Sequence, residues 1–129
     1  MYYLQVSISD IEKIEGVDQD MDKLTVEALE NYLRQTYKGR ANEQSLFMKL
    51  VEEIGEVAEI LNNRSGRKNG KEMSNDDLAN ELADVIHYTV ALAAINDIDL
   101  AHYIVEKDKS AVIKYNHETN LKTFIADRY

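Results

Sequence analysis

The chain of 129 residues contains no cysteine, no proline and no tryptophan, and only five glycines. Without cysteine, neither a disulfide framework nor thiol chemistry is available. Without proline and with few glycines, long uninterrupted helices are permitted. Basic residues are also scarce, since 15 Lys and Arg stand against 24 Asp and Glu and the formal net charge is −9. This charge argues against a nucleic-acid polymer as partner, because binding a nucleic-acid backbone normally requires a basic face.

Long hydrophobic runs are missing as well. No apolar segment approaches the roughly 20 residues of a membrane span. The first residues also lack the basic region and following apolar run of a signal peptide. We therefore expect a cytoplasmic protein with no membrane contact. Its length suits one domain, which is large enough to bury a core without disulfides.

Apolar periodicity and capping residues predict four helices in the rest of the chain. They run from Thr25 to about Lys38, from Asn42 to about Asn62, from Ser74 to about Ile95 and from Asp99 to about Tyr115. The stretch SNDD at the start of the third helix is close to a capping box, with Asp in place of Glu. Helices joined by mostly short connections indicate an all-α, bundle-like fold.

The predicted organisation has three parts. Residues 1–23 form an N-terminal arm or linker, residues 24–115 an all-α domain, and residues 116–129 a C-terminal tail. The arm begins with MYYLQVSI, which alternates as a strand does, and a lone strand needs something to pack against. The segment RSGRKNGK, Arg64 to Lys71, is basic and contains glycine. It is either a solvated connection between helices or a contact for phosphate.

Acidic residues recur at one spacing on the second and third predicted helices. Glu53 and Glu56 are three residues apart, as are Glu81 and Asp84, so each pair spans about 60° of a helix. Both pairs have apolar neighbours, and burying several ionised carboxylates together is costly unless a cation lies among them. Mg²⁺ suits such a cluster, because it takes oxygen ligands and often bridges to substrate phosphates. The alternative is a solvated acidic face.

The apolar residues of the same two helices predict how they pack. On the second helix Glu52 and Glu59 point away from one broad apolar face, which we expect in the core. This face consists of Phe47, Leu50, Val51, Ile54, Val57, Ala58 and Leu61. The third helix is apolar on nearly all sides after Asp84, which indicates a buried helix. A few short helices cannot cover it, so a second copy of the chain is expected to do so.

The acidic pairs resemble a known signature. EEIGE, from Glu52 to Glu56, and ELAD, from Glu81 to Asp84, are similar to the EExxE…ExxD motif of MazG-type nucleotide pyrophosphohydrolases, which belong to the all-α NTP pyrophosphatase superfamily. The likeness covers roughly Leu24 to Tyr115. It implies a four-helix-bundle-like fold that oligomerisation completes, as a homodimer or a dimer-of-dimers tetramer. It also implies Mg²⁺-dependent hydrolysis of a nucleoside triphosphate between the α and β phosphates, giving a monophosphate and pyrophosphate, with Mn²⁺ as an alternative ion.

The resemblance further implies roles for individual residues. The implied metal ligands are Glu53, Glu56, Glu81 and Asp84. The implied catalytic residues are Glu52 and Glu53, with Glu52 supporting the site or the attacking water. The implied substrate-binding residues are Lys107, Lys114 and Tyr115, which fit the family's KxxxNxxRY pattern. Ala111 departs from that pattern, because asparagine is expected there for a sugar or phosphate contact.

Two other functions fit parts of the sequence. Asp84 and His87 form D-x-x-H, which resembles the paired motifs of transition-metal carboxylate bundles. Such a bundle normally has two pairs of this kind, and the sequence offers one. A structural role for His87 is therefore favoured over a ligand role. A non-enzymatic helical interaction protein with a vestigial metal site is the other alternative, which Ala111 leaves open. A nucleobase would stack on an aromatic side chain other than tryptophan, and the candidates, which each also suit the core, are Tyr32, Tyr37, Phe47, Tyr88 and Tyr103.

Overall fold

The structure is a computed structural model that describes residues 23–65 and 73–129. Within these ranges every regular element is a helix, so the predicted all-α fold class is confirmed. The helices are α2 (Val26–Tyr37), α3 (Glu43–Arg64), α4 (Asn75–Ile95), α5 (Leu100–Tyr115) and α6 (Leu121–Arg128). The alternating segment of the predicted arm and most of the basic loop lie outside the described residues.

The four predicted helix starts are confirmed at their capping residues. Thr25, Asn42, Ser74 and Asp99 each accept a hydrogen bond from the backbone N–H three residues further on. At the start of α4 the capping box is complete, with Asp in the position usually held by Glu. Each such cap contributes about 1 kcal/mol to helix stability. The helices therefore begin where local side-chain chemistry directs them.

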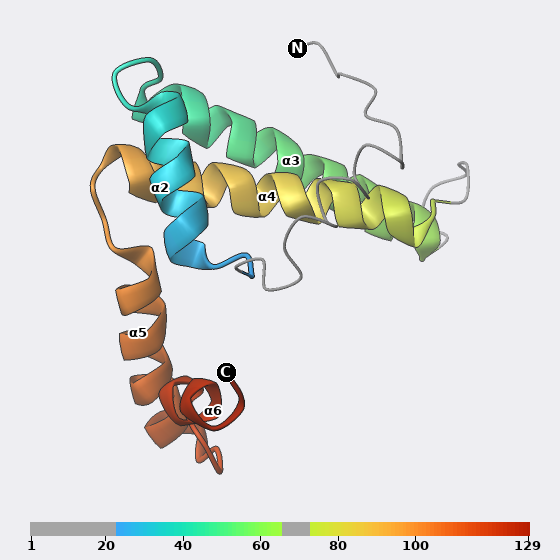
Figure 1. Ribbon diagram of the computed structural model, residues 1–129. Helices are drawn as coiled ribbons and strands as arrows, with labels where there is room; N and C mark the ends of the chain where they lie inside the picture. Colours follow the sequence, from blue (N-terminus) through green and yellow to red (C-terminus); the bar gives the residue numbers. More distant parts are fainter. Residues whose placement is uncertain (1–22, 66–72) are drawn as a thin grey trace, which may run out of the picture.

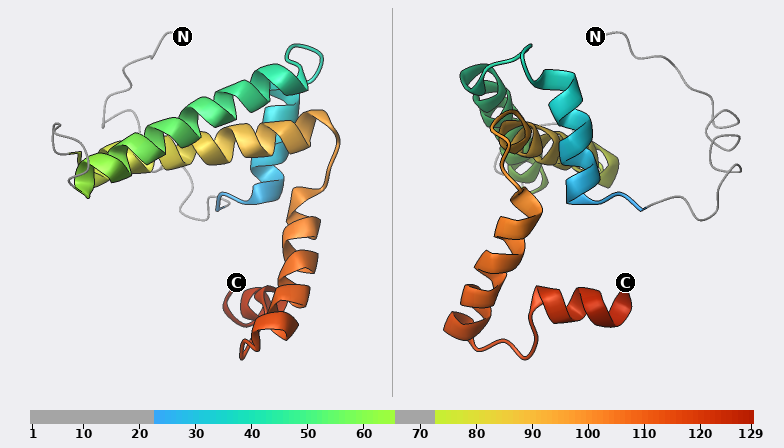
Figure 2. Two further views of the ribbon diagram at one scale, coloured as in Figure 1. Left: turned by 180° about the vertical axis from the view of Figure 1, so that it is seen from behind. Right: turned by 60° about the vertical axis from the view of Figure 1, so that its left-hand side comes forward.

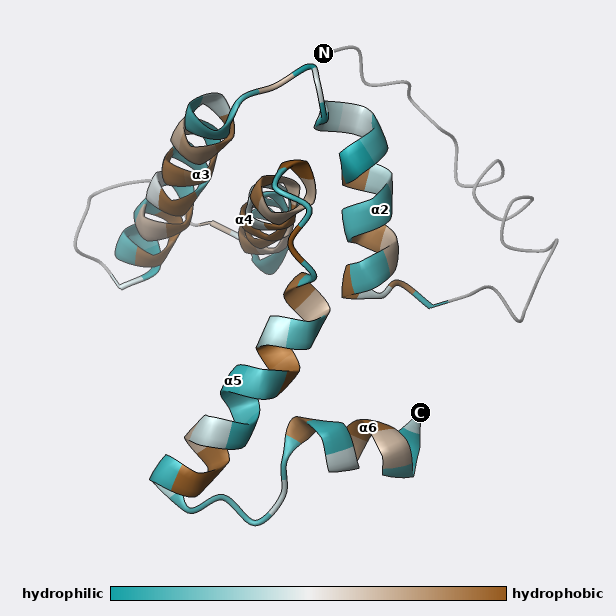
Figure 3. Ribbon diagram, turned by 90° about the vertical axis from the view of Figure 1, so that its left-hand side faces the viewer, coloured by the Kyte–Doolittle hydropathy of each residue, from teal (hydrophilic) through white to brown (hydrophobic). Residues whose placement is uncertain are grey.

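α4 is the central helix of the fold. It lies between α3 and α2 when viewed along its axis (Figure 3), and it packs on both. α3 runs beside it, while α2 crosses near its C-terminal end (Figures 1 and 2). The buried cluster at this crossing consists of Leu33, Leu46, Val90, Ala91 and Ala94. The predicted burial of this helix thus applies to its last turns, at Val90, Ala91, Ala93 and Ala94, whereas Leu82 and Ile86 before them are exposed.

The length and apolar composition of α4 are also those of a helix that could cross a membrane. By length and composition alone, this one helix of the described residues is apolar enough to cross a membrane. The core helix of a soluble protein passes the same test. In this structure α4 packs against α2 and α3 near its C-terminal end and carries Glu81 and Asp84, so packing accounts for the apolar residues of that end.

The face that α3 turns inward differs from the predicted one. Leu46 and Ile60 are buried, and the stripe between them is half-buried at Leu50, Glu53 and Val57. Most of the predicted core face is instead exposed: Phe47, Val51, Ile54, Ala58 and Leu61. Both stripes alternate between spacings of four and three, as helix-packing seams do. The prediction was wrong because the single neighbour α4 covers only the stripe that contains Glu53 and leaves the more apolar one open.

α5 leaves the end of α4 and runs away from the α3–α4 pair (Figure 1). Near its start, Leu100 and Ile104 line a small apolar pocket together with residues of α2 and α4. Further along, α5 packs on α6, where the Leu121 N–H donates to Asp108 Oδ2 at 2.6 Å. The sequence analysis did not predict α6, which occupies most of the second half of the predicted C-terminal tail.

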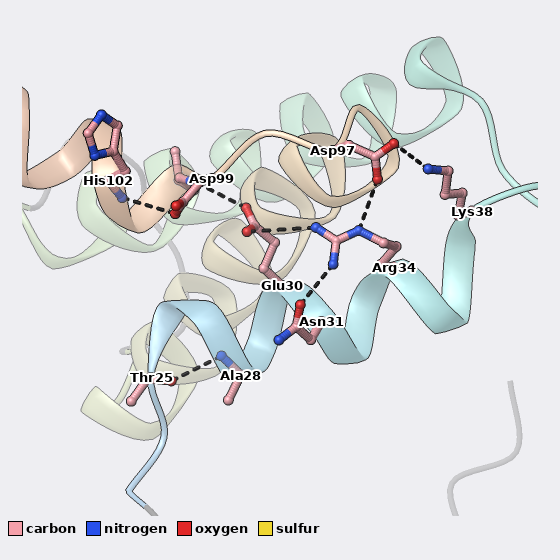
Figure 4. A network of polar contacts seen from close by, with 10 residues as sticks. Thr25, Ala28, Glu30, Asn31, Arg34, Lys38, Asp97, Asp99 and His102 are labelled. Atoms are coloured by element: carbon pink, nitrogen blue, oxygen red, sulfur yellow. Dashed lines mark hydrogen bonds and ion pairs between the residues drawn. The ribbon is translucent and has the colours of Figure 1, made fainter.

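Side chains of α2 hold the turn between α4 and α5 (Figure 4). Glu30 and Arg34 lie four residues apart on one face of α2, and the C-cap residue Lys38 follows after four more. Glu30 Oε1 accepts a hydrogen bond from the Leu100 N–H at 3.2 Å. Arg34 Nε donates to Asp97 Oδ1 at 3.1 Å, and Lys38 pairs with the other Asp97 oxygen. Asp97 has a positive φ of 54°, so its backbone shapes the turn. Its carboxylate pairs with Arg34 and Lys38, so its charge attaches the turn to α2.

Candidate metal and substrate site

Three of the four predicted metal ligands meet between α3 and α4. One carboxylate oxygen each of Glu53, Glu81 and Asp84 lies within 4.8 Å of the other two. Glu53 comes from the middle of α3, and the other two come from successive turns of α4, which packs beside α3 (Figure 2). Glu53 and Glu81 are half-buried and Asp84 is exposed. The cluster is therefore partly withdrawn from water but accessible from one side.

The crowding of these acids changes the protonation of Glu53. Its contact with the Glu81 carboxylate, its burial and the negative charges of Glu81 and Asp84 raise the pKa of Glu53 to about 7. Two neighbouring carboxylates repel when both are ionised, so one of them holds a proton more firmly. In the absence of a cation, the cluster thus reaches its full negative charge only above neutral pH.

Glu81 supplies the observation that tests whether a cation fits. Its Oε2 atom is buried and has no hydrogen-bond partner among the described residues. An unpaired buried carboxylate oxygen is costly, and a cation that accepts this oxygen removes the cost. The donor set consists of carboxylate oxygens alone. Hard divalent cations such as Mg²⁺, Ca²⁺ and Mn²⁺ prefer such oxygen ligands, so the residues fit a divalent ion.

The remaining motif glutamates lie at the edge of this cluster. Glu56 is exposed, one turn beyond Glu53 on α3, and is not a member of the group of three. Glu52 is exposed as well, and its Oε2 lies 3.2 Å from Lys49 Nζ. Glu59 is exposed, as expected for a surface residue. The ligand role of Glu56 and the catalytic role of Glu52 stay predictions.

An aromatic group borders the cluster on α4. Burial raises the pKa of Tyr88, the charge of Lys49 opposes this shift, and the charges of Asp84 and Glu53 add to it. The His87 ring packs edge-on against Tyr37 and Tyr88, and its Nε2 lies 2.7 Å from the Tyr37 hydroxyl oxygen. His87 therefore has a structural partner. Tyr88 follows Asp84 by four residues on the same stripe of α4, as helical spacing predicts, and the charges of Asp84 and Glu53 act on it.

The predicted substrate-binding residues are not near this cluster within one chain. Lys107, Lys114 and Tyr115 lie on the part of α5 that runs away from α3 and α4 (Figure 1). Asp84 lies about 16 Å before the end of α4, at a rise of 1.5 Å per residue. α5 begins only beyond that end, so its lysines are further away along the chain. Near the end of α5, the Lys114 ammonium lies 5.3 Å from the centre of the Tyr115 ring.

Comparison with known proteins now identifies the family. Residues 41–118 match the family model of the MazG nucleotide pyrophosphohydrolase domain. The chain belongs to the MazG family. The match covers more than half of the chain and includes α3, α4 and α5, with all the acids of the motif. Searches of curated proteins and of solved structures found no match.

Membership confirms the resemblance seen in the sequence and agrees with the all-α fold. It supports nucleotide pyrophosphohydrolase activity in general and a requirement for a divalent metal ion. In this MazG domain the carboxylate cluster between α3 and α4 is the group of described residues that suits such an ion.

Proposed function

We propose that the chain hydrolyses a nucleoside triphosphate between the α and β phosphates, giving a nucleoside monophosphate and pyrophosphate. Mg²⁺ is the proposed ion, with Mn²⁺ as a substitute, and the cytoplasm is the proposed location. The observation that carries the proposal is the convergence of Glu53, Glu81 and Asp84, with a buried Glu81 oxygen that lacks a partner. A cation at this place compensates the acids and at the same time attracts phosphate oxygens.

Individual residues have distinct tasks in this reaction. Glu53, Glu56, Glu81 and Asp84 hold the metal ion. When bound, Mg²⁺ supplies neutralising charge for the phosphates and lowers the pKa of a nearby water. Glu52 orients the attacking water and accepts its proton, a task that suits an exposed carboxylate next to Glu53. Because Glu53 and Glu81 are half-buried, water screens their attraction to the ion less than it screens that of exposed carboxylates.

The active form is proposed to be a homodimer or a dimer of dimers. The exposed apolar stripe of α3, from Phe47 to Leu61, lacks a covering element among the described residues. A second α3–α4 pair placed on this stripe would complete a four-helix bundle. Lys107, Lys114 and Tyr115 keep their proposed substrate-binding role in such an assembly, in which α5 of another copy approaches the acids.

The reaction is tested with a panel of ribo- and deoxyribonucleoside triphosphates in the presence of Mg²⁺. Chromatography of the products should show the monophosphate and pyrophosphate as the first products from at least one member of the panel. Diphosphate with inorganic phosphate would contradict the proposed bond cleavage. No turnover of any member would favour the helical interaction protein with a vestigial site.

The transition-metal alternative has less support. Its Asp84–His87 pair requires a free imidazole nitrogen directed at the metal. The His87 Nε2 instead lies 2.7 Å from the Tyr37 hydroxyl oxygen. Metal analysis of the purified protein would reveal tightly bound iron if this alternative were correct.

A further inference from the structure

Cations are scarce on the two helices that carry the acidic cluster. α3 and α4 are described in full, and their only lysine or arginine residues are Lys49 and Arg64. Arg64 ends α3, where its guanidinium donates to Met73 O at 3.2 Å and to Asn75 Oδ1 at 2.8 Å. It lies eleven residues beyond Glu53, about 16 Å along the helix. Lys49, four residues before Glu53, is therefore the lysine or arginine of α3 and α4 that lies nearest to the cluster along the helices.

Lys49 lies on the same side of α3 as Glu53. It precedes Glu53 by four residues on α3, so the two side chains project about 40° apart and about 6 Å apart along the axis. The charge of Lys49 lowers the pKa of Tyr88, whereas the charges of Asp84 and Glu53 raise it. The Lys49 charge therefore acts in the same region as the charges of Glu53 and Asp84.

The present partner of Lys49 holds it only weakly. Its ammonium lies 3.2 Å from Glu52 Oε2, and more than half of each side chain is exposed. Hydrogen bonding to Glu52 raises the pKa of Lys49, which keeps the side chain charged. An exposed lysine–glutamate pair contributes little to stability, because water solvates both charges well. Exchanging Glu52 for a more strongly charged partner therefore costs little.

We propose that Lys49 is a substrate-binding residue that exchanges its Glu52 contact for a phosphate oxygen of the nucleotide at the Glu53–Glu81–Asp84 cluster. This inference rests on the proposed function and adds a cation that the sequence analysis did not assign. A triphosphate carries more negative charge than one divalent ion neutralises, and the chain itself has a net charge of −9. A lysine beside the metal ligands supplies part of the missing positive charge.

The chain offers a matched control for Lys49. Lys109 on α5 forms the same kind of exposed pair, with Glu106 three residues away at 2.8 Å. It has no assigned role in the site, and within one chain it lies on the helix that runs away from the cluster (Figure 1). Lys109→Met removes the same charge and the same type of ion pair as Lys49→Met. A difference between these variants therefore reports the position of Lys49.

The test measures calorimetrically how tightly each variant binds pyrophosphate in the presence of Mg²⁺, beside turnover of the best triphosphate. Lys49→Met should weaken pyrophosphate binding by about tenfold or more, since a charge-assisted hydrogen bond is lost. It should lower kcat/KM similarly, mainly through KM. Lys49→Arg should retain most of the affinity, and Lys109→Met should match the parent. Mg²⁺ alone should bind Lys49→Met at least as tightly as the parent, because a neighbouring positive charge has been removed.

Two results would overturn the inference. If the parent cleaves triphosphates and binds pyrophosphate, and Lys49→Met does both as well as Lys109→Met, Lys49 does not contact phosphate. If the parent neither binds pyrophosphate nor cleaves any triphosphate, the proposed function fails and this inference fails with it. Melting temperatures of all variants, expected to match the parent because both lysines are exposed, separate loss of binding from loss of folding.

Discussion

Glu53 is under opposing physical demands. Its half-buried position beside Glu81 and Asp84 destabilises its negative charge in the absence of a cation, which is why its pKa is raised to about 7. The same crowding makes the three oxygens a preformed set of ligands for a divalent ion. The acids therefore reduce the stability of the metal-free protein and increase its affinity for metal. Both effects are measurable at single residues.

The first prediction concerns neutralisation of one clustered acid. Without metal, Glu53→Gln and Glu81→Gln should leave the free energy of unfolding unchanged or raise it, because repulsion is relieved. Mg²⁺ at 100 times its dissociation constant should stabilise the parent by about 2.7 kcal/mol, and the variants by much less. Turnover should nearly vanish. Thermal melts with and without Mg²⁺, read beside turnover, measure these effects.

The control for this series is Glu59→Gln. Glu59 is on the same helix and exposed, and it is outside the cluster. Its metal response and turnover should stay near those of the parent. If all three variants behave alike, the acids form a solvated face and not a metal site.

The second prediction concerns pH. The ordinary pKa of a glutamate is 4.5, and that of Glu53 in the folded protein is about 7. Between these values the folded state binds more protons than the unfolded state, so the stabilising effect of this protonation is complete below pH 4.5 and is lost as the pH rises through about 7. Urea unfolding of the metal-free protein should show this decrease, and Glu53→Gln should remove much of it. Persistence of the full decrease in Glu53→Gln would assign it to other groups.

At the scale of the elements, the direction of α5 depends on a few polar contacts. Glu30 is 4% exposed and is the one charged residue in the buried set of the described residues. Its carboxylate accepts a hydrogen bond from the first N–H of α5 and lies 3.9 Å from Arg34 Nη2. The same Arg34 guanidinium pairs with Asp97, so Arg34 links Glu30 to the turn (Figure 4). α2 thereby fixes the turn from which α5 departs.

The third prediction tests this arrangement. Glu30→Leu removes the acceptor of the partly buried Leu100 N–H and should lower the free energy of unfolding by about 1–3 kcal/mol. Glu30→Gln keeps an acceptor at the same place, so its loss should be smaller. Urea unfolding measures both, and hydrogen exchange at the Leu100 amide should be faster only in Glu30→Leu. A leucine variant as stable as the glutamine variant would show that the hydrogen bond contributes little.

Helix starts were predictable from the sequence because caps are local. Thr25, Asn42, Ser74 and Asp99 each bond a backbone N–H three residues away, and nothing distant is required. α6 also has such a cap, Asn120. That helix has only eight residues and weak apolar periodicity, and it is held by Asp108 on another helix. A long-range contact of this kind leaves no pattern in the sequence.

The acidic cluster was predictable only in part, because one of its contacts is local and the others are long-range. The i, i+3 spacing of Glu81 and Asp84 fixes their common face on one helix, whereas their contact with Glu53 depends on how α3 is rotated against α4. Helical periodicity identified the most apolar arc of α3 but could not say which arc α4 covers. The inner stripe contains Glu53, and the predicted core stripe is left exposed. The rotation of α3 about its own axis is set by tertiary packing, which helical periodicity does not encode.

For the molecule as a whole, this exposed stripe is the feature that a single chain does not explain. Large apolar residues on α3 remain between 43% and 58% exposed: Phe47, Met48, Val51, Ile54 and Leu61. A contiguous apolar surface of this kind generally marks an interface. Burying it against the same stripe of a second copy recovers the hydrophobic stabilisation that folding of one chain leaves unused, at about 25 cal/mol per Å². Twofold symmetry satisfies such a self-complementary patch.

The last prediction therefore concerns assembly. Ile54 lies in the middle of the stripe and is 50% exposed in the isolated chain. Ile54→Lys would place a charge where the interface is expected, and burying that charge between copies is costly. Light scattering at micromolar concentration should give the mass of a dimer or tetramer for the parent and a smaller mass for Ile54→Lys. Tyr32→Lys on α2, at a position 64% exposed and off the stripe, should keep the parental mass. A monomeric parent, or an Ile54→Lys protein of parental mass, would contradict the assembly through α3.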